Sequence, residues 1–120
     1  MEIELKRIKR SKLYTEGTLR INGTLVTNTI EHSAHLFPTG TYPLNRSTYY
    51  AYFGVGCSWR DSLIQHRIII GDAVIPGVVA RSHYYKERIW WRIKKCKTPI
   101  TLTILDEGCL EVETICHWLR

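Results

Sequence analysis

The sequence lacks several features that mark large classes of proteins. Its all-aliphatic runs, such as Ile68-Ile69-Ile70, reach only three residues, and no apolar segment approaches the ~20 residues that cross a membrane as a helix. The amino-terminal stretch MEIELKRIKRSKLY alternates charged and aliphatic residues and has no apolar core of a signal peptide. We therefore expect no membrane span, no signal peptide and a cytoplasmic location.

Cysteine is present, but not in a pattern that holds a metal. The four cysteines are Cys57, Cys96, Cys109 and Cys116. They form no C-x-x-C pair and match no zinc spacing, so we expect reduced and mostly buried thiols, with no metal and no cofactor. His32 and His35 offer two ligands from one stretch, but the sequence identifies no others, and a solvated loop is the favoured interpretation.

The composition is that of one globular unit with a basic surplus. The chain has 120 residues, 44% of them hydrophobic and 23% charged, without repeats or a Pro/Gly-rich linker. We expect a single domain over residues 1–120. Seventeen Lys and Arg against eleven Asp and Glu give a formal charge of +6, which favours nucleic acid, anionic envelope polymers or an acidic protein surface as partner.

Strands are predicted over most of the chain. Asn22-Gly23 between two alternating runs is typical of a two-residue hairpin turn. It would place Ile21 opposite Thr24 and Leu19 opposite Val26, with Leu19, Ile21, Val26 and Ile30 on the buried face. Residues 2–9 and the aromatic stretch 47–55 also read as strands, and Pro43 predicts an edge strand because proline cannot donate to a ladder.

The chain should end in strands as well. Residues 100–105 and 109–118 alternate around a turn at Gly108, which predicts a C-terminal hairpin. Altogether the sequence predicts an α+β fold: a mostly antiparallel β-sheet or partly open barrel of six to eight strands, with one packed α-helix.

The one predicted helix covers residues 82–97. Ser82 suits the N-cap, and Pro99 should stop the helix. Tyr85, Ile89, Ile93 and Cys96 fall on one narrow stripe at helical spacing and should face the core.

The rest of this helix is a candidate binding surface. It carries two tryptophans and a set of cations, namely Trp90, Trp91, Arg88, Arg92, Lys94 and Lys95. Two adjacent helical residues cannot both face the core, so at least one tryptophan should lie off the stripe. A partner surface, an oligomer interface or a base-stacking platform would use such residues, with Tyr49, Tyr50 and Tyr52 as neighbours. Ordinary solvated helix charges with tryptophans packed at the rim are the simpler alternative.

Two further sets of residues bear on catalysis. Cys57 and His66 would form an activated thiolate if the imidazole lies within hydrogen-bond reach, although no motif fixes their separation. A structural cysteine and a strand-edge histidine are the alternative. Glu31 alternates with Ile30 at the end of the hairpin, and we expect a surface carboxylate there.

Several pieces of sequence recur in a known order. They are residues 17–23, 29–31, 37–42, 68–71, 76–79, the helix from Ser82, and 100–104. Over about residues 2 to 105, this order resembles a small family of bacterial and bacteriophage domains with no assigned function. That family typically has a His-x-Gly-Asn motif followed by a Gly-Cys pair, a pattern similar to the cysteine signature of L,D-transpeptidases, whose thiolate takes the acyl group of a peptidoglycan stem peptide.

The resemblance implies a scaffold that has lost its nucleophile. His66-Arg67 stands where Gly-Cys is expected, and no Gly-Cys pair occurs between residues 58 and 107. Arginine supplies neither the thiolate nor the leaving group of such acyl transfer.

The favoured hypothesis is a non-catalytic binding or structural assembly domain of bacterial or phage origin, cytoplasmic or virion-associated. Its partner would be a protein or a second copy. The question of an enzyme stays open: a cysteine-dependent acyl-transferase or peptidase acting on cell-wall peptides through Cys57 and His66 is the alternative, with peptidoglycan as its ligand. A nucleic-acid-binding domain is the third hypothesis.

Overall fold

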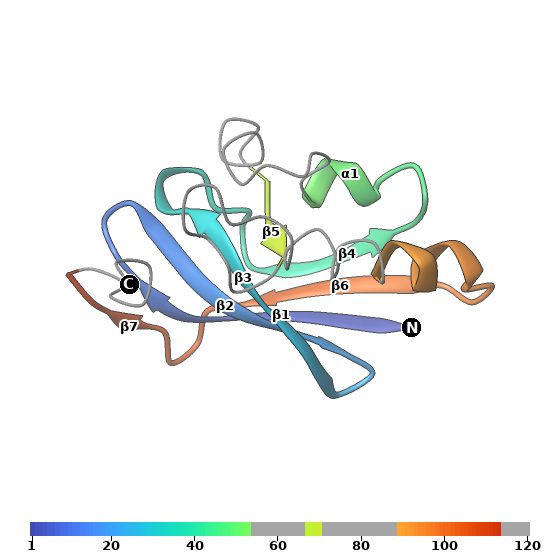
Figure 1. Ribbon diagram of the computed structural model, residues 1–120, viewed down its shortest axis with the longest axis horizontal. Helices are drawn as coiled ribbons and strands as arrows, with labels where there is room; N and C mark the ends of the chain where they lie inside the picture. The colour runs from blue at the N-terminus through green and yellow to red at the C-terminus, as the bar shows by residue number, and fades with distance from the viewer. Residues whose placement is uncertain (54–66, 71–88, 114–120) are drawn as a thin grey trace.

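Strands make up half of the part of the chain that the structure describes. This computed structural model describes residues 1–53, 67–70 and 89–113 (Figure 1). In chain order the elements are β1 (Glu2–Arg10), β2 (Tyr14–Ile21), β3 (Thr24–His32), the 3-10 helix η1 (Ser33–His35), β4 (Gly40–Leu44), α1 (Tyr49–Tyr52), β5 (Ile69–Ile70), a helix over 89–95, β6 (Ile100–Leu105) and β7 (Leu110–Glu111).

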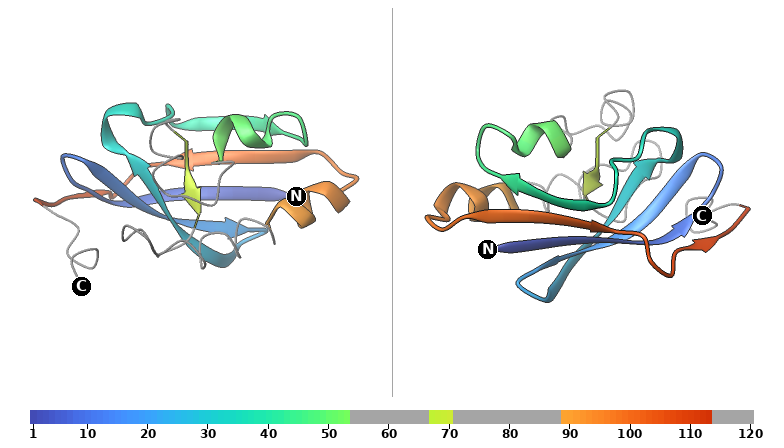
Figure 2. Two further views of the ribbon diagram at one scale, coloured as in Figure 1. Left: turned by 45° about the horizontal axis from the view of Figure 1, so that its top comes forward. Right: turned by 180° about the vertical axis from the view of Figure 1, so that it is seen from behind.

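The seven strands form one open sheet. Its order is β4-β6-β1-β2-β3-β5, and β7 pairs with β1 beyond the end of β6. β1 runs parallel to β6 and β7, while the remaining pairs are antiparallel. The predicted β-rich α+β fold is therefore confirmed. Of the two predicted arrangements the structure shows the open sheet, because β4 and β5 lie at its opposite edges and the sheet is not a closed barrel (Figure 2).

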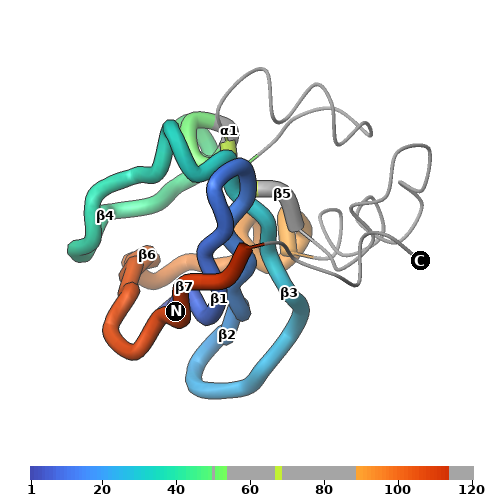
Figure 3. Tube along the Cα trace, turned by 90° about the vertical axis from the view of Figure 1, so that its left-hand side faces the viewer, coloured from blue at the N-terminus to red at the C-terminus, as the bar shows by residue number. Residues whose placement is uncertain are grey.

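The hydrophobic core lies on one face of this sheet. Figure 3 shows α1 and the 89–95 helix on the same side of the curved sheet. Buried side chains of β1, β2, β4 and β6 pack there against α1 and the helix, and they include Ile3, Leu5, Leu19, Ile21, Leu44, Tyr49, Ile89, Ile93, Leu102 and Ile104. The sheet thus positions the helix through its apolar stripe, which leaves the other side of the helix for solvent.

The hairpin between β2 and β3 has the predicted turn and a corrected register. Asn22 and Gly23 have φ of 50° and 83°, the left-handed values that this turn requires. The pair beside the turn is as predicted, but Leu19 faces Thr27 rather than Val26, because the pairing shifts by one residue after Leu19. Such a β-bulge leaves one residue of the strand unpaired, and Val26 is accordingly half-buried at the margin of the core.

β4 is the edge strand that Pro43 predicts. Among the described strands it pairs with β6 alone, and Pro43 lies opposite Thr101 in an antiparallel register. A proline can occupy this position because its missing N–H would point away from the sheet. The prediction is confirmed.

The end of the chain differs from the predicted hairpin. Gly108 has φ of 78°, so the turn itself is confirmed. Within residues 100–113, however, β6 and β7 do not pair with each other; both pair with β1 in parallel, β6 along its first half and β7 along Lys9 and Arg10. The turn returns the chain to the same line along β1 instead of reversing it, so the predicted C-terminal hairpin was wrong.

Within residues 47–53, the described part of the strand predicted over residues 47–55, the structure has the short helix α1 instead of a strand. The side-chain oxygen of Asn45 accepts hydrogen bonds from the backbone N–H groups of Ser47 (2.9 Å) and Thr48 (3.1 Å), which starts a turn. Tyr49 and Phe53, four residues apart, are both buried and their rings stack at 5.0 Å. Aromatic residues that favour a strand by propensity here form one face of a helical turn, because burial of that face outweighs propensity.

The predicted helix is present over the part of it that is described. It runs over 89–95, and residues 82–88 lie outside the described residues. Ile89 and Ile93 are buried and Cys96 is half-buried, so this part of the predicted stripe is confirmed. The helix ends two residues earlier than predicted, where the N–H of Cys96 donates to the carbonyl of Ile93 at 3.3 Å in a tighter final turn.

Glu31 is buried, which corrects the prediction of a surface carboxylate. Its side chain accepts two hydrogen bonds from Arg7 of β1, Nε to Oε1 at 3.0 Å and Nη2 to Oε2 at 2.9 Å. Arg7 Nη2 also donates to the carbonyl of Phe37 at 2.8 Å. Gly17 of the intervening β2 lies opposite Arg7, and with no side chain there Arg7 can reach across β2 to β3.

Candidate binding surface

The two adjacent tryptophans of the 89–95 helix have different environments. Trp90 is half-buried and packs against the core, with its ring 5.0 Å from that of Tyr49. Trp91 is 54% exposed. Because successive helical residues point about 100° apart, one tryptophan had to leave the core stripe, and that prediction is confirmed. Tyr49 is itself fully buried and therefore belongs to the core rather than to the predicted surface.

Two ammonium groups lie over the ring of Trp91. The Nζ atoms of Lys94 and Lys95 are 4.7 Å and 5.2 Å from its centroid. Cation–π contacts at exposed sites contribute about 0.5–1 kcal/mol each, so they restrain two otherwise flexible side chains. Arg92 is exposed on the same helix. These four residues, Trp91, Arg92, Lys94 and Lys95, form what we call the cationic platform.

The platform carries more positive charge than the helix end requires. A helix C-terminus is equivalent to about half a negative charge, whereas Lys94, Lys95 and the following Lys97 supply three positive ones. Among the described residues the ion pairs join Arg7 to Glu31 and Arg10 to Asp106 and Glu111, and none includes a platform residue. The sequence from 88 to 105 contains no Asp or Glu. The platform is therefore a site of net positive charge.

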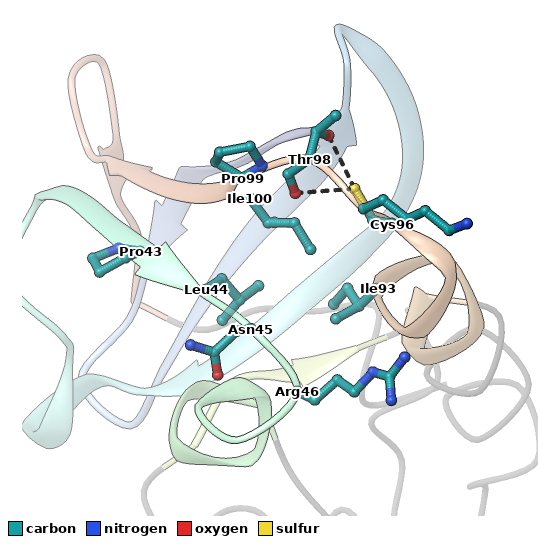
Figure 4. A pocket seen from close by; sticks show the side chains of 10 residues that line it. Pro43, Leu44, Asn45, Arg46, Ile93, Cys96, Thr98, Pro99 and Ile100 are labelled. Carbon is teal, nitrogen blue, oxygen red and sulfur yellow. Dashed lines mark hydrogen bonds between the residues drawn. The ribbon is translucent and has the colours of Figure 1, made fainter.

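A groove opens beside the platform, between β4, the turn that follows it and the end of the 89–95 helix. Its volume is about 510 Å³. Figure 4 shows Leu44, Ile93 and Ile100 pointing into it from three elements, and these three side chains are buried. Arg46 and Lys97 are the charged residues that line it. We call this cavity the basic groove.

The turn after β4 fixes one wall of the basic groove. The hydrogen bonds from Ser47 and Thr48 to the side chain of Asn45 hold the chain in a tight turn. Arg46 projects from this turn toward the helix, where its Nη2 donates to the carbonyl of Lys94 at 2.9 Å. The arginine thereby satisfies one of the carbonyls that a helix end leaves without an internal partner. Residues 48 apart in sequence are joined in this way.

Cys96 lies in the wall of the groove, with its thiol beside Thr98. Its Sγ is 3.3 Å from Oγ1 and 3.4 Å from the carbonyl oxygen of Thr98. The side-chain hydrogen bond with Thr98, followed by the backbone one, lowers the pKa of the Cys96 thiol. Burial instead raises the pKa of the Cys109 thiol. Cys96 and Cys109 are both free and only half-buried, whereas mostly buried thiols were expected.

Several predicted site residues lie outside the described residues. They are Arg88 of the binding surface, the side chain of Tyr50, and Cys57 and His66 of the catalytic alternative. That alternative therefore stays a hypothesis.

The predicted loop at His32 and His35 forms η1 and its N-cap. His32 Nδ1 accepts a hydrogen bond from the N–H of Ala34 at 3.2 Å, and the two imidazole rings are 5.3 Å apart. Within residues 1–53, 67–70 and 89–113, no group of three or more His, Cys, Asp or Glu side chains could hold a metal ion.

Arg46 and Lys97 are functional candidates that the sequence analysis did not single out. Lys97 stands in the predicted last turn of the helix, and Arg46 follows an Asn in a turn-forming stretch, but both patterns are common on ordinary surfaces. Their shared groove depends on a tertiary contact, and the only local signal was the absence of Asp and Glu from both surrounding segments.

Comparison of the chain with models of known protein families, with curated proteins and with solved structures finds no match. In the part of the chain that is described, none of the helices has the length and apolarity needed to cross a membrane.

Proposed function

We propose that this chain is a non-catalytic binding domain, and that its cationic platform binds an acidic segment of a protein partner. The observation that carries the proposal is the exposed ring of Trp91 with two ammonium groups held over it at 4.7 Å and 5.2 Å. Restraining Lys94 and Lys95 before binding reduces the entropy lost when a carboxylate pairs with them.

The charge of the platform favours an acidic partner over a second copy of the same chain. A symmetric dimer places the same patch of both subunits face to face. Lys94 and Lys95 would then oppose their own equivalents, and like charges at an interface disfavour association. A partner that presents carboxylates meets no such repulsion.

The same geometry favours a polypeptide over a nucleic acid. Single-stranded nucleic acids bind by stacking bases on open aromatic faces. The ammonium groups of Lys94 and Lys95 lie over the ring of Trp91 and would compete with a base for it. Carboxylates need only the ammonium groups themselves.

Non-catalytic action is supported by the sequence. If the resemblance to the bacterial and bacteriophage family holds, His66-Arg67 occupies the position of that family's Gly-Cys pair, and arginine cannot replace the nucleophile. We therefore propose that the chain is a degenerate relative of that family, which keeps the scaffold and works by binding.

The test is the affinity for a fluorescein-labelled peptide of twelve glutamates, measured by fluorescence anisotropy at low and at physiological salt. Trp91→Ala removes no charge, yet it releases both lysines and should weaken binding by at most about 5- to 30-fold, the equivalent of two cation–π contacts of about 0.5–1 kcal/mol each. Lys12→Gln is the control for net charge: it removes one charge in the turn between β1 and β2, at the opposite end of the molecule (Figure 1). It should leave the affinity unchanged.

Three results would contradict the proposal. Equal affinities of Trp91→Ala and the parent protein would show that the platform is not used. An equal loss of affinity in Lys12→Gln would show that the peptide is attracted only by the net charge of the protein. Tighter binding of a labelled twelve-residue oligothymidine than of the peptide would favour the nucleic-acid alternative. Circular dichroism confirms that each variant is folded.

A further inference from the structure

The basic groove combines an apolar floor with a cationic rim. Leu44, Ile93 and Ile100 form the floor, and each is less than 8% exposed although it borders an open cavity. Arg46 and Lys97 are exposed at the rim. A ligand that fits both parts must present an apolar group next to an anion.

The rim has hydrogen-bonding capacity left for such an anion. An arginine offers five N–H donors, and within the described residues Arg46 makes one hydrogen bond, to the carbonyl of Lys94. A guanidinium binds a carboxylate through two parallel N–H groups, and Lys97 can add a third contact as a point charge. Of the ten residues that line the groove none is an Asp or Glu, so no carboxylate in its lining competes.

The size and place of the groove fit part of a polypeptide. Its volume of about 510 Å³ lies within the range of roughly 300–1,000 Å³ that is typical of ligand sites. The groove lies at the same helix end that carries the cationic platform, because Ile93 and Cys96 line it while Lys94 and Lys95 stand between them in the sequence. A small isolated ligand would fill the groove without using the platform.

We infer that the groove binds one apolar side chain of the partner's acidic segment, while Arg46 and Lys97 bind the carboxylate of an adjacent residue. This inference rests on the proposed function and adds to it the chemistry of the partner: an aliphatic residue flanked by Glu or Asp. The aliphatic side chain covers Leu44, Ile93 and Ile100, and the remaining carboxylates of the segment pair with the platform.

Two labelled peptides test this inference directly. One has a central leucine between two runs of five glutamates, and the other has alanine in place of that leucine. Burial of the leucine should make the first bind about 10-fold more tightly. Arg46→Gln and Lys97→Gln should each lower the affinity for the leucine peptide several-fold. Lys12→Gln should again leave that affinity unchanged. Lys97 is exposed and lies outside the helix, so Lys97→Gln still tests the inference if Arg46→Gln disturbs the helix end.

Protection of a cysteine from alkylation shows where on the protein the peptide binds. Cys96 lines the groove and Cys109 does not, so the leucine peptide should slow iodoacetamide modification of Cys96 several-fold and leave Cys109 unaffected. Mass spectrometry of the proteolytic peptides quantifies each site. Equal affinity for the two peptides together with unprotected Cys96 would overturn this inference, while Trp91→Ala would still weaken the all-glutamate peptide if the proposed function holds. Absence of binding by all three peptides would overturn both.

Discussion

Cations occupy two contrasting places in this molecule. Arg7 lies inside the core, 2% exposed, with its guanidinium bonded to both carboxylate oxygens of Glu31. Lys94 and Lys95 lie at the surface over Trp91, and no ion pair among the described residues includes them. The first cation is neutralised and fixes the relation of β1 to β3. Lys94 and Lys95 are restrained by Trp91 but are not neutralised by a carboxylate in the described part of the chain.

A carboxylate partner, more than exposure alone, separates the structural Arg7 from the surface lysines that we propose to bind an acidic segment. Transfer of a charge into a low-dielectric interior is unfavourable unless it is paired and hydrogen-bonded, so Arg7 must have Glu31. At the surface water solvates the ammonium groups, and no carboxylate of the chain is required. The contrast can be broken by removing the partner in each region.

The largest effect is expected in the buried pair. Glu31→Ala leaves the Arg7 guanidinium charged and without its main acceptor inside the core, and should lower the free energy of unfolding by about 3–5 kcal/mol. Urea denaturation followed by circular dichroism measures it. The double variant Arg7→Met/Glu31→Leu, which removes both charges, should recover most of that loss. A Glu31→Ala variant as stable as the parent, or a double variant less stable than Glu31→Ala, would contradict this account of the pair.

A smaller effect should separate the two tryptophans. Trp90 packs against the core and Tyr49, so Trp90→Ala should lower the free energy of unfolding by about 2–3 kcal/mol, less than a fully buried tryptophan. Trp91→Ala removes only surface contacts and should cost about 1 kcal/mol or less. The same urea titration compares them. Similar losses for both would mean that Trp91 is a structural residue and not part of a binding surface.

The smallest effect concerns the two thiols, and it changes rates rather than stability. The thiolate is the reactive form, and a lowered pKa gives Cys96 a larger thiolate fraction than Cys109 at any pH below both pKa values. Cys96 should therefore react faster with iodoacetamide near neutral pH, and this advantage should shrink as the pH rises and Cys109 also ionises.

The control for the thiols is Thr98→Val, which removes the side-chain hydrogen bond to Cys96. It should shift the reactivity of Cys96 to higher pH and leave Cys109 as it was. Faster reaction of Cys109 at pH 7, or no change in Thr98→Val, would show that Thr98 does not set the reactivity of this thiol.

Local chemistry explains which parts of the fold were predictable. The hairpin turn follows from Asn22-Gly23 because few other pairs adopt its φ values, and Pro43 marks an edge strand because it lacks an N–H. The helix stripe of Ile89 and Ile93 follows from periodicity alone. Each of these signals lies within a few residues of the feature it predicts.

The remaining features depend on contacts between distant residues. Burial of Glu31 requires Arg7, 24 residues away, and a β1 whose pairing with β2 shifts between Arg7 and Lys9. Alternation of apolar residues cannot show that an arginine points inward. The basic groove likewise arises where Arg46 meets the end of a helix 48 residues later. The candidate site was therefore half predictable: Trp91 and the lysines beside it were, and the groove was not.

The most direct measurement of the central claim is a titration of the ¹⁵N-labelled protein with the twelve-glutamate peptide, followed by backbone amide chemical shifts. We predict that the shift changes concentrate at residues 91–98 and around Arg46, and that they saturate together. Lys6, Lys9 and Lys12, which are exposed lysines of β1 and the turn after it, should show none. Changes centred on those lysines, or spread evenly over the basic residues, would contradict the claim that the cationic platform is the binding surface.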